Sequence, residues 1–209
     1  MRYAVETMPT VLRHTATDEV SRALAAADPE LGALIDRAGE VDIVVTGGGF
    51  EVMAESIVSQ QLATKVAATI WGRVAERVGT SAEEIAAASH ETLRELGLSN
   101  RKAEYLHGIA AATLSGEIEW DALEALDDEA VIETLVALRG VGRWTAEMYL
   151  IFALGRPDVL AVDDFGLRAS AGTMSGLGRP MTREELTERG VRWAPHRSAA
   201  SLWLWAGHA

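Results

Sequence analysis

An aspartate pair, Asp163 and Asp164, follows a glycine-rich turn at residues 140–142. A carboxylate held next to a substrate stabilises positive charge as that charge develops. The turn reads Leu-Arg-Gly-Val-Gly-Arg-Trp-Thr-Ala from residue 138 to residue 146. If a helix starts directly after the glycines, its unpaired backbone N–H groups and its dipole together favour an anion such as phosphate. These residue types therefore predict a phosphate site that needs no side-chain charge, and a carboxylate downstream of it.

Two helices must flank this turn to position it. The first is predicted over residues 128 to about 138, with Asp127 or Asp128 as its N-cap and apolar residues along one face. The second is predicted over residues 143 to about 154, where a glycine and a proline end it. The two glycines of the turn are expected to adopt backbone angles that a side chain would forbid.

The remaining sequence also predicts mostly helices, from apolar periodicity and from capping residues. They cover residues 18–27, 29–38, 50–59, 63–78, a short stretch after 81, 89–97, 99–114, 165–171, 182–192 and 197–206. Capping boxes lie at residues 81–84 and 182–185. A core stripe is predicted on the 63–78 helix, from Val66, Ile70, Val74 and Val78. Residues 41–45 are extended at best, and residues 1–16 hold either a short strand or irregular structure.

Composition excludes several classes of site. The chain has 209 residues, 48% of them apolar, which is enough for a sizeable packed core. It has no cysteine, which excludes disulfides, thiolate zinc sites and an iron–sulfur cluster. The N-terminus lacks the apolar run of a signal peptide, and no stretch reaches the length of a membrane span. We therefore expect a cytoplasmic protein with no membrane partner.

The net charge of −12 argues against a nucleic-acid partner, because neutralising phosphate supplies much of the affinity for DNA. A DNA-binding role requires a local basic face. The candidates for that face are Arg139, Arg143, Lys65, Arg73, Arg101 and Lys102. Scattered arginines on a solvated surface are the alternative interpretation.

The turn Leu138-x-Gly-Val-Gly-x-x-Thr-Ala146, with Asp164 downstream, resembles the helix–hairpin–helix DNA glycosylase superfamily. The similarity spans residues 18–207 and is strongest to the alkylpurine branch, the 3-methyladenine DNA glycosylase II type, in a compact form without an N-terminal β domain. It implies an all-α, two-lobed fold of about ten helices within one unit, residues 1–209. One lobe would be residues 50–154, and the other residues 1–49 plus 155–209.

The resemblance also implies roles for individual residues. Asp164 matches the catalytic aspartate, while Asp163 is expected to cap the next helix; N-capping is the alternative for both. The DNA-binding residues of the turn would be Gly140, Gly142, Arg143 and Thr145. Backbone carbonyls would hold a sodium or potassium ion, those of Val136, Leu138 and Val141. The chemistry itself would need no cofactor.

Further resemblances suggest a wedge and a base pocket. Gln60, Gln61 and Leu62 match the loop that enters the minor groove, where either Gln61 or Leu62 would fill the gap left by an extruded nucleotide; a solvated turn is the alternative. The base pocket would hold Trp144, Met148 and Trp205. Trp144 stands where strand-nicking members carry lysine, and Met148 where a tyrosine is usual. A core tryptophan is an equally good interpretation of Trp205.

These features predict a monofunctional DNA glycosylase that hydrolyses the N-glycosidic bond of alkylated purines, such as 3-methyladenine and 7-methylguanine, after base flipping in base excision repair. Its partner would be double-stranded DNA with alkylated bases, and the protein a monomer associated with the nucleoid. One alternative is a non-catalytic helix–hairpin–helix protein that binds DNA or senses lesions. Another is an acidic helical interaction protein with no role on DNA.

Overall fold

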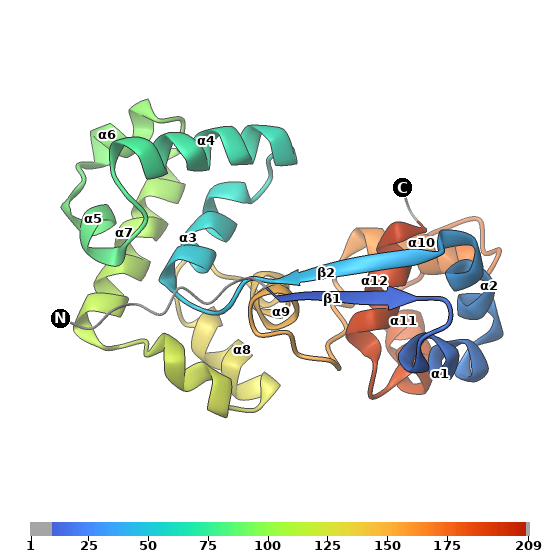
Figure 1. The fold of residues 1–209 in the computed structure, drawn as a ribbon. Coiled ribbons are helices and arrows are strands. Elements are labelled where there is room, and N and C mark those ends of the chain that lie inside the picture. Colours follow the sequence, from blue (N-terminus) through green and yellow to red (C-terminus); the bar gives the residue numbers. More distant parts are fainter. Residues whose placement is uncertain (1–9, 208–209) are drawn as a thin grey trace. The chain divides into compact units, whose positions relative to one another are not determined.

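A computed structural model describes residues 10–207 of the chain (Figure 1). These residues divide into two compact units. The terminal unit contains the described residues up to Gly47 and those from Leu150 onward, and the central unit is Gly48–Tyr149. The fold is mostly helical, with twelve α-helices, α1 to α12, within residues 10–207, so the predicted all-α class is confirmed with one small sheet added.

The small sheet belongs to the terminal unit. Strands β1 (Thr10–Thr15) and β2 (Glu40–Val45) pair antiparallel, with Thr10 opposite Val45, and lie side by side in Figure 1. The helices of this unit are α1 (Glu19–Ala27), α2 (Pro29–Ala38), α10 (Phe165–Met174), α11 (Arg183–Gly190) and α12 (Arg197–Ala206). A 3₁₀ turn, η3 (Val191–Trp193), joins the last two.

Helix α12 is at the core of the terminal unit and packs against α2, α10 and β2. Its Trp203 is fully buried, as is Trp193 of η3. The indole Nε1 of Trp193 donates to Asp28 Oδ2 at 2.9 Å, and Arg189 of α11 donates to both oxygens of Asp28. This buried ion pair joins the start of α2 to the end of α11.

The central unit contains α3 (Phe50–Ser59), α4 (Thr64–Arg77), α5 (Ala82–Ala87), α6 (His90–Glu95), α7 (Asn100–Ser115), the 3₁₀ helix η1 (Trp120–Ala125), α8 (Asp128–Val136) and α9 (Arg143–Met148). Helix α7 is its longest element and packs against α3, α5 and α6. The helix predicted after the turn is α-helical only as far as Met148. A π-helical segment, η2 (Tyr149–Ala153), continues it. Wider π turns of this kind are rare and are frequent at functional sites.

Local sequence signals account for most helix starts. Asp127 caps α8 by accepting from Ala130 N at 2.9 Å, and both predicted capping boxes are present, at the starts of α5 and α11. The core stripe predicted for α4 is wrong at its first position, because Val66 is 47% exposed. The buried residues of α4 are instead Ala67, Ile70, Trp71 and Val74, which follow the helical i, i+3, i+4, i+7 pattern.

Within residues 10–207, none of the helices combines the length and apolar character needed to cross a membrane.

Candidate functional site

The predicted hairpin forms between α8 and α9, and its two glycines have different structural roles. Gly140 has φ +97°, and a Cβ added there would collide with the ring of Tyr105. Gly140 is therefore required by the fold itself. Gly142 has φ −96° and ψ 168°, which any residue adopts, so the expectation of a special backbone angle is wrong there. A Cβ at Gly142 would meet nothing within 4 Å, so this glycine leaves open space in front of the helix start.

The arginines of the hairpin are paired with carboxylates. Arg143 donates Nη1 and Nη2 to Glu129 at 2.7 and 2.9 Å, and Nε to Glu147 at 3.1 Å. The hydrogen bond to Glu129 raises the pKa of the Arg143 guanidinium, and the same bond lowers the pKa of Glu129. Arg139 approaches Glu104 at 3.3 Å. The basic residues of the hairpin are thus largely neutralised by the chain's own acids, although Arg143 and Glu129 remain half-exposed.

The Gln60-Gln61-Leu62 loop connects α3 to α4 and contacts the hairpin. Gln60 Nε2 donates to Gly140 O at 3.1 Å and to Thr145 Oγ1 at 3.3 Å, so its amide fastens the loop rather than pointing to solvent. Gln61 has φ +59°, and among the described residues it is the one non-glycine residue with positive φ. Leu62 is 38% exposed. The loop therefore presents an exposed apolar side chain directly after a residue in an uncommon backbone conformation.

A pocket of about 410 Å³ lies beside this loop, entirely within the central unit. It is lined by Ser56, Ser59, Gln60, Gln61, Leu62, Trp144 and Thr145. Trp144 is 41% exposed, an unusual state for so large an apolar ring. Met148, one helical turn further along, is half-buried. The structure thus brings the predicted loop residues and one predicted pocket aromatic to the same hollow.

Lys102 does not contribute to an open basic face. Its Nζ donates to Val58 O at 2.7 Å and to Gln60 O at 2.6 Å, at the carboxyl end of α3. Desolvation by burial lowers the pKa of this ammonium. Sequence reasoning missed this contact because its partners lie 44 and 42 residues away, so no local pattern reports it.

Asp164 lies in the terminal unit as the N-cap of α10. Its Oδ1 accepts from Leu167 N at 2.8 Å and from Trp205 Nε1 at 3.1 Å. Asp163 was predicted to be the cap, and this is wrong, because its side chain instead pairs with Arg183. The carboxylate of Asp164 is therefore oriented by two donors, one from the helix start and one from an indole.

Trp205 is half-buried, whereas Trp203 two residues earlier is fully buried. The Trp205 ring stacks on Phe152 with centroids 5.9 Å apart. A Cβ at Gly166 would lie 3.1 Å from Asp164 Oδ1 and 3.5 Å from the Trp205 ring, so this glycine makes room for the pair. A glycine in the first turn of a helix, directly after Phe165, was the sequence signal that could have indicated this close approach.

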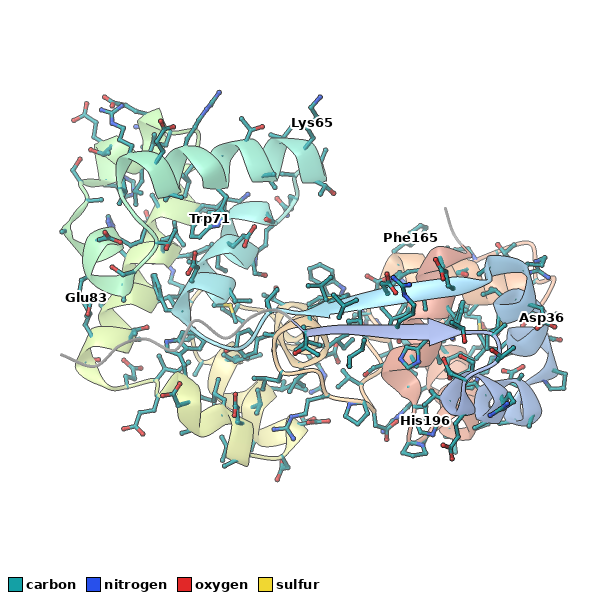
Figure 2. All side chains as sticks on the ribbon, viewed as in Figure 1. Asp36, Lys65, Trp71, Glu83, Phe165 and His196 are labelled. Atoms are coloured by element: carbon teal, nitrogen blue, oxygen red, sulfur yellow. The ribbon has the colours of Figure 1, made fainter. Side chains whose placement is uncertain are left out.

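Phe165 is a further residue that sequence reasoning missed. It begins α10, is 61% exposed and is labelled in Figure 2. The guanidinium of Arg168 lies 5.9 Å from its ring centroid. An exposed aromatic that directly follows Asp164 is a second apolar surface next to the carboxylate.

For a metal, the described residues offer carbonyls rather than side chains. Residues 10–207 contain no group of three or more His, Asp or Glu side chains that could hold an ion. In the hairpin, Leu138 O accepts from Val141 N at 3.1 Å, and a carbonyl oxygen has a second lone pair.

Comparison with known proteins decides the family. A model of the HhH-GPD superfamily of base excision DNA repair proteins matches residues 54–196. The chain belongs to this superfamily. The resemblance inferred from the hairpin and the downstream aspartate is thereby confirmed. The match includes the loop at residues 60–62, the hairpin and Asp164, whereas Trp205 lies beyond its end.

Several relatives of this HhH-GPD protein are named as 3-methyladenine DNA glycosylases. It is 36% identical over 161 residues to DNA-3-methyladenine glycosylase 1 of Schizosaccharomyces pombe, covering 75% of this chain and 71% of that protein. The crystal structure of a DNA-3-methyladenine glycosidase from Bacillus halodurans matches with a TM-score of 0.85 and 36% identity, covering 95% of this chain and 93% of that one. A 3-methyladenine DNA glycosylase from S. pombe, in complex with abasic DNA, matches with a TM-score of 0.83 and 32% identity, covering 90% and 95%.

Proposed function

We propose that this HhH-GPD protein is a monofunctional DNA glycosylase that hydrolyses the N-glycosidic bond of alkylated purines, of the 3-methyladenine and 7-methylguanine type, in base excision repair. The observation that carries the proposal is the Asp164 carboxylate, held by Leu167 N–H and by the indole N–H of Trp205. The names of the relatives point to the same reaction.

Asp164 acts on the sugar. Breaking an N-glycosidic bond builds positive charge on the deoxyribose, and a carboxylate whose orientation is already set stabilises that charge without reorganising. The two donors to Oδ1 provide the fixed orientation. The same carboxylate can orient the attacking water. A cationic alkylated base leaves readily, so the reaction needs no second carboxyl group as general acid.

Access to the bond requires that the nucleotide leave the base stack, which costs on the order of a few kcal/mol. In our proposal Gln61 or Leu62 fills the vacated space, and the exposure of Leu62 supports this role. The N–H groups of Gly140, Gly142 and Thr145 bind a backbone phosphate, where the open space at Gly142 permits close approach. Arg143 contributes by exchanging a carboxylate partner for phosphate.

We assign binding of the base to three residues, Trp144, Met148 and Trp205. A cationic base over an indole face gains roughly 0.5–2 kcal/mol, which favours alkylated over normal purines. Trp144 also decides the reaction type. An indole cannot form the Schiff base through which a lysine would nick the strand, so the proposed enzyme is a hydrolase only.

A sodium or potassium ion held by carbonyls of the hairpin, those of Val136, Leu138 and Val141, is a further part of the proposal. The uncharged oxygen donors suit such an ion, and the second lone pair of the Leu138 carbonyl is compatible with it. The ion would add positive charge near the phosphate without a basic side chain. We propose double-stranded DNA as the partner of a monomeric protein working on the nucleoid in the cytoplasm.

The test is release of 3-methyladenine from methylated DNA under single-turnover conditions. Asp164→Asn keeps an oxygen that accepts from Leu167 and Trp205, and asparagine is a good N-cap, so the variant is expected to fold. It should bind lesion-containing DNA but lose at least about 100-fold in rate, as expected when a transition-state charge loses its partner.

Asp163→Asn is the matched control, because it removes the same charge one residue away and breaks only the pair with Arg183. Its rate should stay close to that of the wild type. Equal activity of Asp164→Asn and the wild type would contradict the role of Asp164. A folded wild-type protein that binds alkylated DNA and releases no base would instead indicate a lesion-sensing protein.

A further inference from the structure

The loop at Gln60, Gln61 and Leu62 has little packing support of its own. One side borders the 410 Å³ pocket that Trp144 lines. Another side borders a second cavity of about 210 Å³, lined in part by Ile70, Leu98 and Lys102. A segment that borders two hollows has fewer packing neighbours than a core segment, so polar contacts contribute more to its conformation.

Those contacts are few and specific. The Gln60 amide fastens the loop to the hairpin through Gly140 O and Thr145 Oγ1. On the α3 side, the Lys102 ammonium donates to two backbone carbonyls, Val58 O and Gln60 O. The next residue, Gln61, has a positive φ that few side chains adopt. The uncommon conformation therefore begins directly after the second carbonyl that Lys102 binds.

The ammonium is suited to this position. The last carbonyls of a helix lack intrahelical partners and carry the negative end of the helix dipole. At the end of α3, Ser56 O accepts from Gln60 N and Ser59 O accepts from Leu62 N, while Lys102 takes Val58 O. Charge-assisted hydrogen bonds of this kind are stronger than neutral ones.

We propose that Lys102 is a positioning residue for base extrusion, whose ammonium clamps the carboxyl end of α3 so that Gln61 and Leu62 are presented in the conformation that fills the vacated stack. This inference rests on the proposed glycosylase function. Lys102 touches neither the base nor the sugar in this role and acts through the loop.

The experiment compares two DNA substrates. 7-Methylguanine is placed opposite cytosine, or opposite an abasic site where no base pair has to be broken. Lys102→Met keeps the side-chain length and removes the charge. Excision opposite cytosine should slow about tenfold, the effect of losing a charge-assisted hydrogen bond. Opposite the abasic site the loss should be much smaller, because extrusion is less costly there.

Three further variants complete the design. Lys102→Arg should restore excision on both substrates, since a guanidinium can reach the same two carbonyls. Arg101→Met is the matched control: it removes an exposed charge from the neighbouring position of α7 and should affect both substrates equally. Lys102→Gln, which keeps a donor without the charge, should show an intermediate loss with the same substrate dependence, and replaces Lys102→Met if that variant does not fold.

The outcomes are distinct. A loss confined to the paired substrate supports the inference. An equal loss on both substrates, or no loss in folded variants, overturns the role of Lys102 while leaving the glycosylase proposal intact. Absence of excision by the wild-type protein on both substrates, together with no release of 3-methyladenine from methylated DNA, overturns the proposed function itself.

Discussion

Two arginines of this protein have the same chemistry in opposite surroundings. Arg143 in the central unit and Arg189 in the terminal unit each contact two acidic residues, and each forms a bidentate pair with one of them. The side chain of Arg189 is 13% exposed and its partner Asp28 is 1% exposed. The side chains of Arg143 and Glu129 are 50% and 58% exposed. The geometry of the pairs is alike, and burial separates them.

This difference in burial indicates which arginine can leave its carboxylate for another anion. A buried carboxylate that loses its partner is left as an uncompensated charge, so the pair at Asp28 behaves as a permanent link. An exposed pair contributes little to stability and is screened by solvent. Arg143 can therefore leave Glu129 for a phosphate at small cost. In the proposed function of this chain, whose net charge is −12, the acids beside the hairpin hold Arg143 in place until DNA competes for it.

The largest expected effect is on the buried pair. Asp28→Asn keeps an N-cap for α2 but removes the charge opposite Arg189, so the free energy of unfolding should fall by about 3–5 kcal/mol. Urea denaturation measures this loss. Asp42→Asn, which breaks the exposed pair between β1 and β2 with Arg13, is the control and should leave the midpoint unchanged.

A second measurement on the same variant uses pH. Burial acts to raise the pKa of Asp28, but hydrogen bonds from Arg189 and Trp193 outweigh it and hold this pKa below its usual value. The contribution of a carboxylate with a lowered pKa is present above about pH 4, the unfolded value, and is lost as the pH falls through the folded pKa. The stability difference between wild type and Asp28→Asn should therefore shrink in acid. A difference that grows in acid would contradict the pair.

A smaller effect is expected when the backbone N–H groups of the hairpin can no longer bind phosphate. Gly142→Val places a side chain in open space, so the fold should survive, but the phosphate would be blocked. We expect DNA affinity to fall about tenfold at every sequence, as for a lost hydrogen bond to a charged group. Gly108→Val on α7, where an added Cβ also meets nothing within 4 Å, is the control in a fluorescence-anisotropy titration. Unchanged affinity of folded Gly142→Val would exclude the phosphate anchor.

The smallest effect concerns the exchangeable pair itself. Glu129→Gln should leave thermal stability nearly unchanged and raise DNA affinity, because Arg143 no longer has to leave a carboxylate. The gain is measured as the ratio of the dissociation constants of variant and wild type at one salt concentration, because contacts to phosphate depend on salt. Glu95→Gln removes the same charge from an exposed pair with Arg77 and serves as the comparison. An equal gain in affinity in both variants would show that Arg143 does not contact phosphate.

The sequence by itself determined the features that depend on neighbouring residues. Asp127 caps α8 and the two Ser/Thr-x-x-Glu boxes open α5 and α11, because each of these bonds closes within three residues. The spacing of the hairpin and the downstream aspartate was enough to place the chain in the HhH-GPD superfamily. The positive φ of Gly140 also agrees with the expectation that the turn needs a glycine there.

Only the tertiary structure decided which groups meet across long stretches of chain. Asp163 and Asp164 are chemically identical in the sequence, and the contacts with Arg183 and Trp205 distinguish them. The Gln60 amide donates to groups of the hairpin that lie 80 and 85 residues away in the sequence. Lys102, a candidate surface charge in the sequence, donates to a backbone carbonyl at the end of α3. Such contacts depend on how helices pack, and packing is set by many apolar side chains together rather than by the pattern around any one polar residue.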